Sequence, residues 1–212
     1  MIAMEQTGRT PDDAVAEALR KLGLPREYVL VLTLAEGAKG FLGFGGQEAR
    51  VRLTVTPAGE RLIQARVTLE RLLALMGVQA DVYAEERQGF LHLEVSGEHA
   101  GLLIGKYGQT IEAVQFLVGR ILDRRIGERI QVQIDVEGYR ERRRQRLEQM
   151  ALRLAKQVKA TGEAVVLEPM TPADRRIIHL VLQTDAEVRT ASVGDGRERR
   201  LMIVPEASHR SP

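Results

Sequence analysis

The chain of 212 residues contains no cysteine and only four histidines. The lack of cysteine excludes disulfide bonds, thiolate metal sites and a cysteine nucleophile, and it is typical of proteins of the reducing cytosol. The histidines form no His-x-His or His-Glu-x-x-His pattern, and the Gly-x-Ser-x-Gly nucleophile motif is missing. These absences predict a protein that is not an enzyme and that uses no metal or cofactor.

Long hydrophobic runs are also absent. Even the apolar stretch over residues 177–182 is interrupted by His179, and it falls far short of the roughly 18 residues that a membrane span requires. The first ten residues contain no basic segment followed by an apolar core, and Glu5 lies where a secretion signal is uncharged or positive. We therefore expect a cytoplasmic protein without direct membrane insertion.

The residues that are present can build cores, since 44% are hydrophobic and 28% are charged. The length predicts two or three small modules. The formal net charge of +2 hides an asymmetry, because residues 137–212 carry 15 Lys and Arg against 11 Asp and Glu, whereas residues 57–136 carry 9 against 11. A local basic surface in the last third of the chain must therefore supply any attraction to phosphate.

The first module covers residues 1–56, for which the pattern predicts a βαββ-like unit. Thr10-Pro11 places an N-cap hydroxyl before a proline at the first helical position, which predicts a helix over residues 11–22. Alternation of apolar and polar residues predicts two strands, over residues 28–34 and 49–55.

A glycine-rich segment joins these two strands. It leads into a strand, where a dinucleotide-binding fingerprint needs a helix, so we expect no nucleotide site here. The segment carries four residues that we predict to dock a protein partner, namely Lys39, Phe41, Leu42 and Phe44. The same side chains are equally compatible with packing inside the module's own hydrophobic core, and the sequence leaves both interpretations open.

The second module covers residues 57–136. After a short break at residues 57–59, an amphipathic helix is predicted over residues 61–76. The remaining elements follow from periodicity: a hairpin around residues 82–95, a short helix over 98–104, a longer helix over 109–122 and a strand over 130–136. In the longer helix we expect Leu117 to point inward. The predicted order is therefore α-β-β-α-α-β.

The last two helices of this module are joined by Gly105-Lys106-Tyr107-Gly108. The glycines let the backbone approach an anionic polymer, Lys106 can pair with a phosphate, and the next helix N-terminus adds positive potential. With Ile104 and Ile111 as its apolar flanks, the motif resembles the signature of the KH domain, and the order of elements resembles the type II KH fold. The resemblance implies that the loop clamps about four nucleotides, with both isoleucines along a groove for bases.

Simpler interpretations accompany this motif. The two glycines would also serve a plain turn between helices, and Tyr107 would then be an exposed turn residue instead of a stacking partner for a base. The matching flanks and the order of elements favour the KH interpretation.

The third module covers residues 137–205, and residues 206–212 are expected to form a flexible tail. A long helix, a short strand, a second helix opened by Thr171-Pro172 and a closing hairpin are predicted. In the second helix Arg175 and His179 are four apart and share a face, where both can grip phosphate. The Arg-x-x-x-His spacing resembles the R-three-H motif of domains that bind single-stranded nucleic acid, and Arg176 is adjacent. The alternative is a solvated helix face with a partly buried histidine.

A dense run of arginines opens the long helix of this module. Cations near a helix N-terminus are unfavourable for the helix dipole, so the run needs another explanation. A bound polyanion would supply one, and we single out Arg140, Arg143 and Arg144 as nucleic-acid contacts. The alternative is a structural network with Glu137, Glu141 and Glu148.

The three motifs in this order resemble the bacterial Jag family, also called the SpoIIIJ-associated or KhpB family. The resemblance implies an α+β protein of three modules that binds single-stranded RNA as a regulator, and it is linked to cell elongation and division. It also implies pairing with a small single-KH protein and association with a membrane insertase. Some relatives carry a long charged linker after the first module, whereas about five residues separate the modules here.

Two functions of different class follow. The first is a non-enzymatic binder of single-stranded RNA, with single-stranded DNA as a competing ligand. The second is a protein adaptor that docks through the first module, with nucleic-acid binding secondary. A homodimer is compatible with both.

Overall fold

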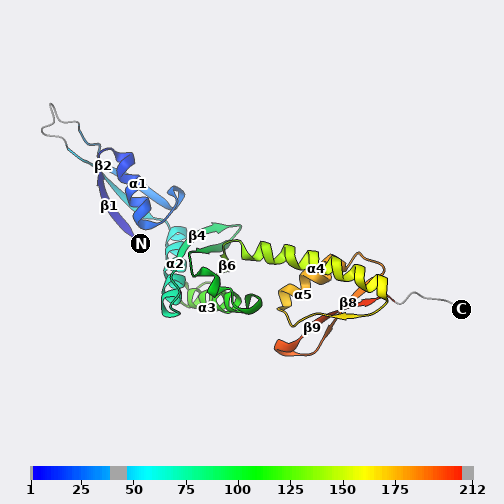
Figure 1. The fold of residues 1–212 in the computed structure, drawn as a ribbon. Coiled ribbons are helices and arrows are strands. Elements are labelled where there is room, and N and C mark those ends of the chain that lie inside the picture. The colour runs from blue at the N-terminus through cyan, green and yellow to red at the C-terminus, as the bar shows by residue number, and fades with distance from the viewer. Residues whose placement is uncertain (1, 39–46, 207–212) are drawn as a thin grey trace. The chain divides into compact units, whose positions relative to one another are not determined.

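The computed structural model describes residues 2–38 and 47–206 (Figure 1). The described elements form three sheets of three strands each, with helices against them, which confirms the predicted α+β class. The chain divides into two compact units. The first holds residues up to 103 together with 112–135, and the second holds residues 104–111 together with those from 136 onward.

The N-terminal module has the predicted βαββ order. Strands β1 (Ala3–Gly8), β2 (Val29–Ala35) and β3 (Ala49–Val55) form an antiparallel sheet in the order β1-β3-β2. Helix α1 (Pro11–Leu22) begins where the Thr10 hydroxyl accepts a hydrogen bond from the Asp13 amide at 3.2 Å. It ends at Gly23, and a 3₁₀ turn (Arg26–Tyr28) leads into β2.

Helix α1 covers one face of this sheet. In β3, Ala49, Val51, Leu53 and Val55 are buried. The leucines of β2 lie on the opposite face, since Leu30 and Leu32 pair with Thr54 and Arg52, and they are 67% and 58% exposed. The predicted docking residues Lys39, Phe41, Leu42 and Phe44 lie outside the described residues.

Helix α2 (Pro57–Leu75) begins at Pro57, so the predicted break at residues 57–59 is wrong. The Thr56 hydroxyl accepts a hydrogen bond from the Gly59 amide at 3.2 Å, and Pro57 occupies the first turn. This is the same Thr-Pro start that opens α1. The glycine at position 59 is a requirement of packing, because a Cβ there would lie 2.9 Å from the Tyr28 carbonyl oxygen.

The sheet of the second module has the order β4-β5-β6, from β4 (Asp81–Arg87), β5 (Phe90–Ser96) and β6 (Val132–Val136). The short helix predicted over residues 98–104 is reduced to a 3₁₀ turn, Ala100–Leu103, and a second 3₁₀ turn, Lys106–Gly108, lies in the loop before α3 (Gln109–Ile126). Helix α3 buries Ile111, Val114, Val118 and Leu122. The expectation for Leu117 is wrong, because it lies off this stripe and is half exposed.

Arg66 of α2 joins the first two modules. Its guanidinium donates hydrogen bonds to the carbonyl oxygens of Leu22 at 2.7 Å and Gly23 at 3.3 Å, which are the unpaired acceptors at the end of α1. Gly23 has a φ of +61°, and a Cβ there would lie 1.7 Å from Arg66 Nη1. A glycine is therefore needed both for the helix end and for the approach of the arginine.

The C-terminal sheet has the antiparallel order β7-β9-β8, from β7 (Val165–Val166), β8 (Val188–Val193) and β9 (Arg200–Pro205), with a 3₁₀ turn (Gly196–Glu198) between the last two. Helices α4 (Tyr139–Thr161) and α5 (Pro172–Leu182) pack against each other and against this sheet (Figure 1). Their shared core is apolar and includes Leu147, Ala151, Ile178, Leu182 and Ile203.

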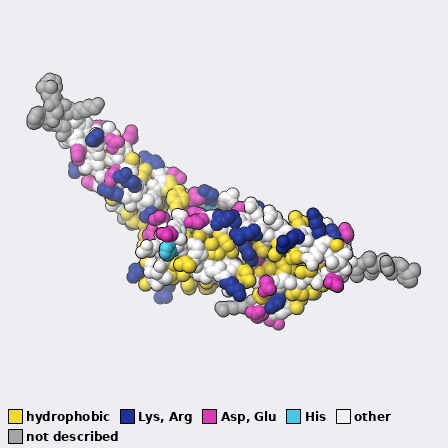
Figure 2. All heavy atoms as spheres, in the orientation of Figure 1, with side chains coloured by type: hydrophobic (Ala, Val, Ile, Leu, Met, Phe, Trp, Pro, Cys, Tyr) yellow, Lys and Arg dark blue, Asp and Glu magenta, His cyan; other side chains and the backbone are white. Residues whose placement is uncertain are grey.

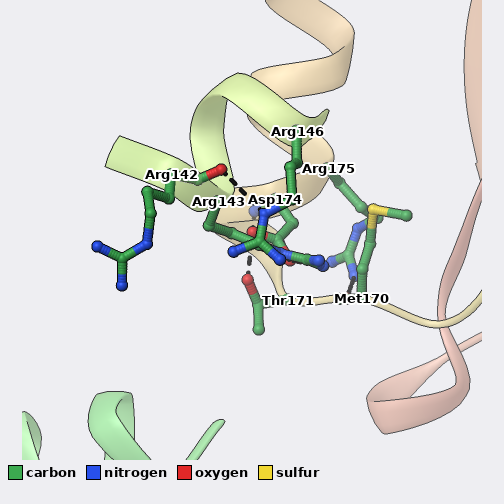
Figure 3. Close-up of polar contacts among 7 residues, drawn as sticks. All are labelled: Arg142, Arg143, Arg146, Met170, Thr171, Asp174 and Arg175. Carbon is green, nitrogen blue, oxygen red and sulfur yellow. Dashed lines mark hydrogen bonds and ion pairs between the residues drawn. The ribbon is translucent and has the colours of Figure 1, made fainter. Parts of the chain in front are cut away.

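A buried ion pair ties α4 to α5 (Figure 3). Arg143 Nη2 and Nε lie 2.8 and 3.2 Å from Asp174 Oδ2, and the aspartate side chain is only 7% exposed. The amide of Asp174 also donates to the Thr171 hydroxyl at 3.2 Å, which caps α5. The carboxylate therefore depends on Arg143 for compensation of its buried charge.

We predict that Arg66→Met lowers the free energy of unfolding by about 1.5 kcal/mol, because it removes charged donors from the carbonyls that end α1. Urea unfolding followed by circular dichroism measures the change. Arg71→Met is the matched control on the same helix, since Arg71 is exposed and forms no ion pair within the described part of the chain. Equal midpoints for the two variants would contradict the capping role.

We predict a larger loss, about 3 kcal/mol, for Arg143→Met, because the variant leaves the buried Asp174 carboxylate unpaired. The double variant Arg143→Met/Asp174→Asn carries no such charge and should recover part of the loss. Urea unfolding of the parent, the single and the double variant tests this. A double variant less stable than the single one would show that the uncompensated charge is not the cause.

Candidate nucleic-acid interface

The two glycines of the central loop are required by its backbone geometry. Gly105 has φ +68° and ψ −172°, a conformation that only glycine adopts readily, and a Cβ there would lie 2.0 Å from Thr110 Oγ1. Gly108 has φ +84°, and a Cβ there would lie 3.3 Å from the ring of Tyr139. Gly105 is exposed and Gly108 is buried, so the loop brings bare backbone to the surface at Gly105, shortly before the N-terminus of α3.

Tyr107 is half-buried and has a positive φ of 57°, which is unfavourable for a residue with a Cβ. Two cations lie near its ring: Lys106 Nζ is 5.4 Å and Arg143 Cζ is 5.6 Å from the ring centroid. The loop and α4 belong to the same compact unit.

The two flanking isoleucines differ in exposure. Ile111 is 2% exposed and packs in the core, so it holds the loop in place. Ile104 is half-buried and is the one of the two with surface left for a base. That Ile104 and Ile111 line a groove for bases remains a prediction.

The predicted arginines of α4 already have partners. Arg144 lies between Glu141 and Glu148, with nitrogen–oxygen distances of 2.6 Å to each. The hydrogen bond from Arg144 holds the pKa of Glu141 below its usual range, with help from Gln145. Arg143 forms an ion pair with Asp174, and Arg140 is half-buried and has an interaction of its own. The structural network that the sequence offered as an alternative is therefore present around Arg144.

Two other arginines of the run, Arg142 and Arg146, are exposed and form no ion pair with any acidic residue that the structure describes. Arg146 Nε donates to the Arg142 carbonyl oxygen at 3.2 Å, and the Arg142 guanidinium donates to the Glu137 carbonyl. The Arg142 side chain points away from the Arg143–Asp174 pair (Figure 3). The sequence already indicated which arginines lack an acidic partner on the helix. Neither Arg142 nor Arg146 has an acid three or four residues away, whereas Arg144 has two.

The Arg-x-x-x-His pair lies on α5 as predicted, but its members differ in accessibility. Arg175 is half-buried, and its Nη1 donates to the carbonyl oxygen of Met170 at 2.6 Å. His179 is exposed, and its Nδ1 lies 2.7 Å from Thr190 Oγ1, which orients the ring. Arg176 is exposed and has no ion pair within residues 2–38 and 47–206. The free positive charge of α5 is therefore that of Arg176.

The basic side chains of α4 lie beside apolar ones on the face shown in Figure 2. Within the described residues, no cluster of three or more His, Asp or Glu is arranged to hold a metal ion. Among the same residues, no helix combines the length and the hydrophobicity that a membrane span needs.

Three family descriptions match this chain in succession. They are Jag N-terminus over residues 6–55, KhpA/KhpB, KH domain over residues 64–134, and the R-three-H domain over residues 145–205. The order and the positions correspond to the three motifs found in the sequence.

Curated relatives match most of the chain. The RNA-binding protein KhpB of Bacillus subtilis is 38% identical over 201 residues, which cover 92% of this chain and 95% of that protein. The protein of the same name from Clostridium symbiosum is 35% identical over 96% of this chain and 92% of its own length. A third, from Lactiplantibacillus plantarum, is 35% identical over 65% of this chain and 44% of its own length. This chain belongs to the KhpB family, the Jag family that its motifs predicted.

Proposed function

We propose that this protein binds single-stranded RNA without catalysis, as a regulator in the cytoplasm. The relatives that match nearly the whole chain are named RNA-binding proteins, which supports the proposal. The observation that carries it is the loop, where exposed Gly105, in a conformation that only glycine adopts readily, presents its backbone next to Lys106. Lys106 is exposed and unpaired by any acid among the residues that the structure covers.

Phosphate contacts come from four exposed cations of the second compact unit: Lys106, Arg142, Arg146 and Arg176. Contacts of this kind fix a strand in position without reading its sequence. With four neutralised phosphates, the slope of the logarithm of affinity against the logarithm of salt concentration should be about −3 for a single strand. The partly exposed Ile104 and Tyr107 supply the surface on which bases lie.

A second function, protein docking through the first module, is favoured by the exposed leucines of β2. Leu30, Leu32 and Leu34 lie on an edge strand that contains neither a charge nor a proline, which is unusual for an exposed edge. We propose this surface as the adaptor site, together with Lys39, Phe41, Leu42 and Phe44. A small single-KH protein, a second copy of the chain or a membrane insertase would be its partners, and a role in cell elongation would follow from either function.

The loop variant Lys106→Asp/Tyr107→Asp should lose most RNA affinity, roughly tenfold or more, because it replaces a phosphate-binding cation by two carboxylates. The fold should be kept, since aspartate tolerates the positive φ of position 107. Fluorescence anisotropy with an unstructured oligoribonucleotide measures the affinity. Arg87→Asp/Gln88→Asp is the matched control, because it makes the same charge change at an exposed turn where Gln88 also has a positive φ. An equal loss of RNA affinity in both variants would show that the loop is not the RNA-binding site.

The unpaired arginines of α4 should contribute to binding more than the paired one. Arg142→Gln/Arg146→Gln is expected to make the salt slope shallower by about 1.4, since two phosphate contacts are lost. The control Arg144→Gln/Glu141→Gln removes an existing ion pair and keeps the net charge, so its slope should stay unchanged. Salt titrations of RNA affinity distinguish the two, and a larger effect of the control pair would refute this assignment.

A further inference from the structure

An apolar hollow of about 410 Å³ opens within the second compact unit, between α4 and residues 165–170. Its lining includes the apolar side chains Leu147, Met150, Leu154 and Val166 together with Tyr107 and Arg146. The volume is in the range of small-ligand sites. None of the Jag, KH or R-three-H features described above accounts for this hollow.

The chemistry of the hollow fits a planar group that is attached to a negative charge. Its lining is mostly apolar, and it also contains Tyr107, Arg143, which is paired with Asp174, and Arg146. Arg146 has no acidic partner in the described part of the chain, so it can face a phosphate. Glu168, the one acidic residue of the lining, is exposed and offers an acceptor to an amino group. A nucleobase with its phosphate meets all of these conditions.

Tyr107 connects this hollow to the loop. Its ring lines the hollow, while the preceding residue, Lys106, is the proposed phosphate contact. The positive φ of Tyr107 is a local strain, and its ring contacts the cations of Lys106 and Arg143. A nucleotide whose phosphate lies at Lys106 therefore has its base within reach of the hollow.

We propose that this hollow binds one nucleobase of the strand that the loop holds. The inference rests on the proposed RNA binding and adds a second place of base contact, apart from the groove beside Ile104. The base would lie against the aliphatic side chains of α4 with its edge toward Tyr107, and its phosphate would lie between Lys106 and Arg146.

The test fills the hollow. Met150→Trp places an indole in the space of the base and should weaken binding of an unstructured oligoribonucleotide roughly tenfold, as expected when one base contact is lost. Leu152→Trp is the matched control, since Leu152 is on the same helix, is 51% exposed and does not line the hollow. Affinity for an abasic sugar-phosphate strand of the same length should be equal in the parent and in both variants.

A second variant tests the same site independently, in case Met150→Trp disturbs the core. Val166→Glu, at a position that is 54% exposed, adds a negative charge to the hollow and should weaken binding of the base-bearing strand more than that of the abasic strand. If the parent binds both strands equally well and neither variant changes this, the base site is refuted while RNA binding stands. If the parent retains no strand at any salt concentration, the proposed function fails as well. Weakening of the abasic strand alone would also refute the base site.

Discussion

The constraint on which the rest of the molecule's proposed chemistry depends is the positive-φ backbone of the central loop. Gly105 and Gly108 both have positive φ, and each lies where a Cβ would meet a neighbouring side chain. Tyr107, which lies between them, has its ring centroid 5.6 Å from Arg143 Cζ, and the loop belongs to the same compact unit as α4. A KH-type loop and the arginines of α4 therefore lie in one unit.

The arginines of that unit divide into two groups by their electrostatic partners. Arg143, Arg144 and Arg175 are held by a buried carboxylate, by two surface carboxylates and by a backbone carbonyl, so much of their hydrogen-bonding capacity is used inside the protein. Arg142 and Arg146 keep their charge open to solvent. A cation that is already neutralised gains little from a phosphate, whereas an unpaired one releases counterions from the strand.

Local chemistry made several parts of this fold predictable. The Thr-Pro starts at Thr10 and Thr171 gave helices where expected, and the alternation of β3 gave its buried face. The same Thr-Pro chemistry at Thr56 was overlooked, because the proline and glycine after it suggested a break. Leu117 was misplaced because apolar residues outnumber the positions that the core of α3 can bury.

The sequence by itself determined the family, the three motifs and the order of helices and strands, because these depend on residue spacing and on caps only a few residues long. Tertiary structure alone decided which arginine is paired with an acid of another element, as with Arg143 and Asp174, which are 31 residues apart. It also decided that Tyr107 faces α4 and borders an apolar hollow. The physical reason is that burial and charge pairing depend on distances in space, and periodicity along one helix does not contain them.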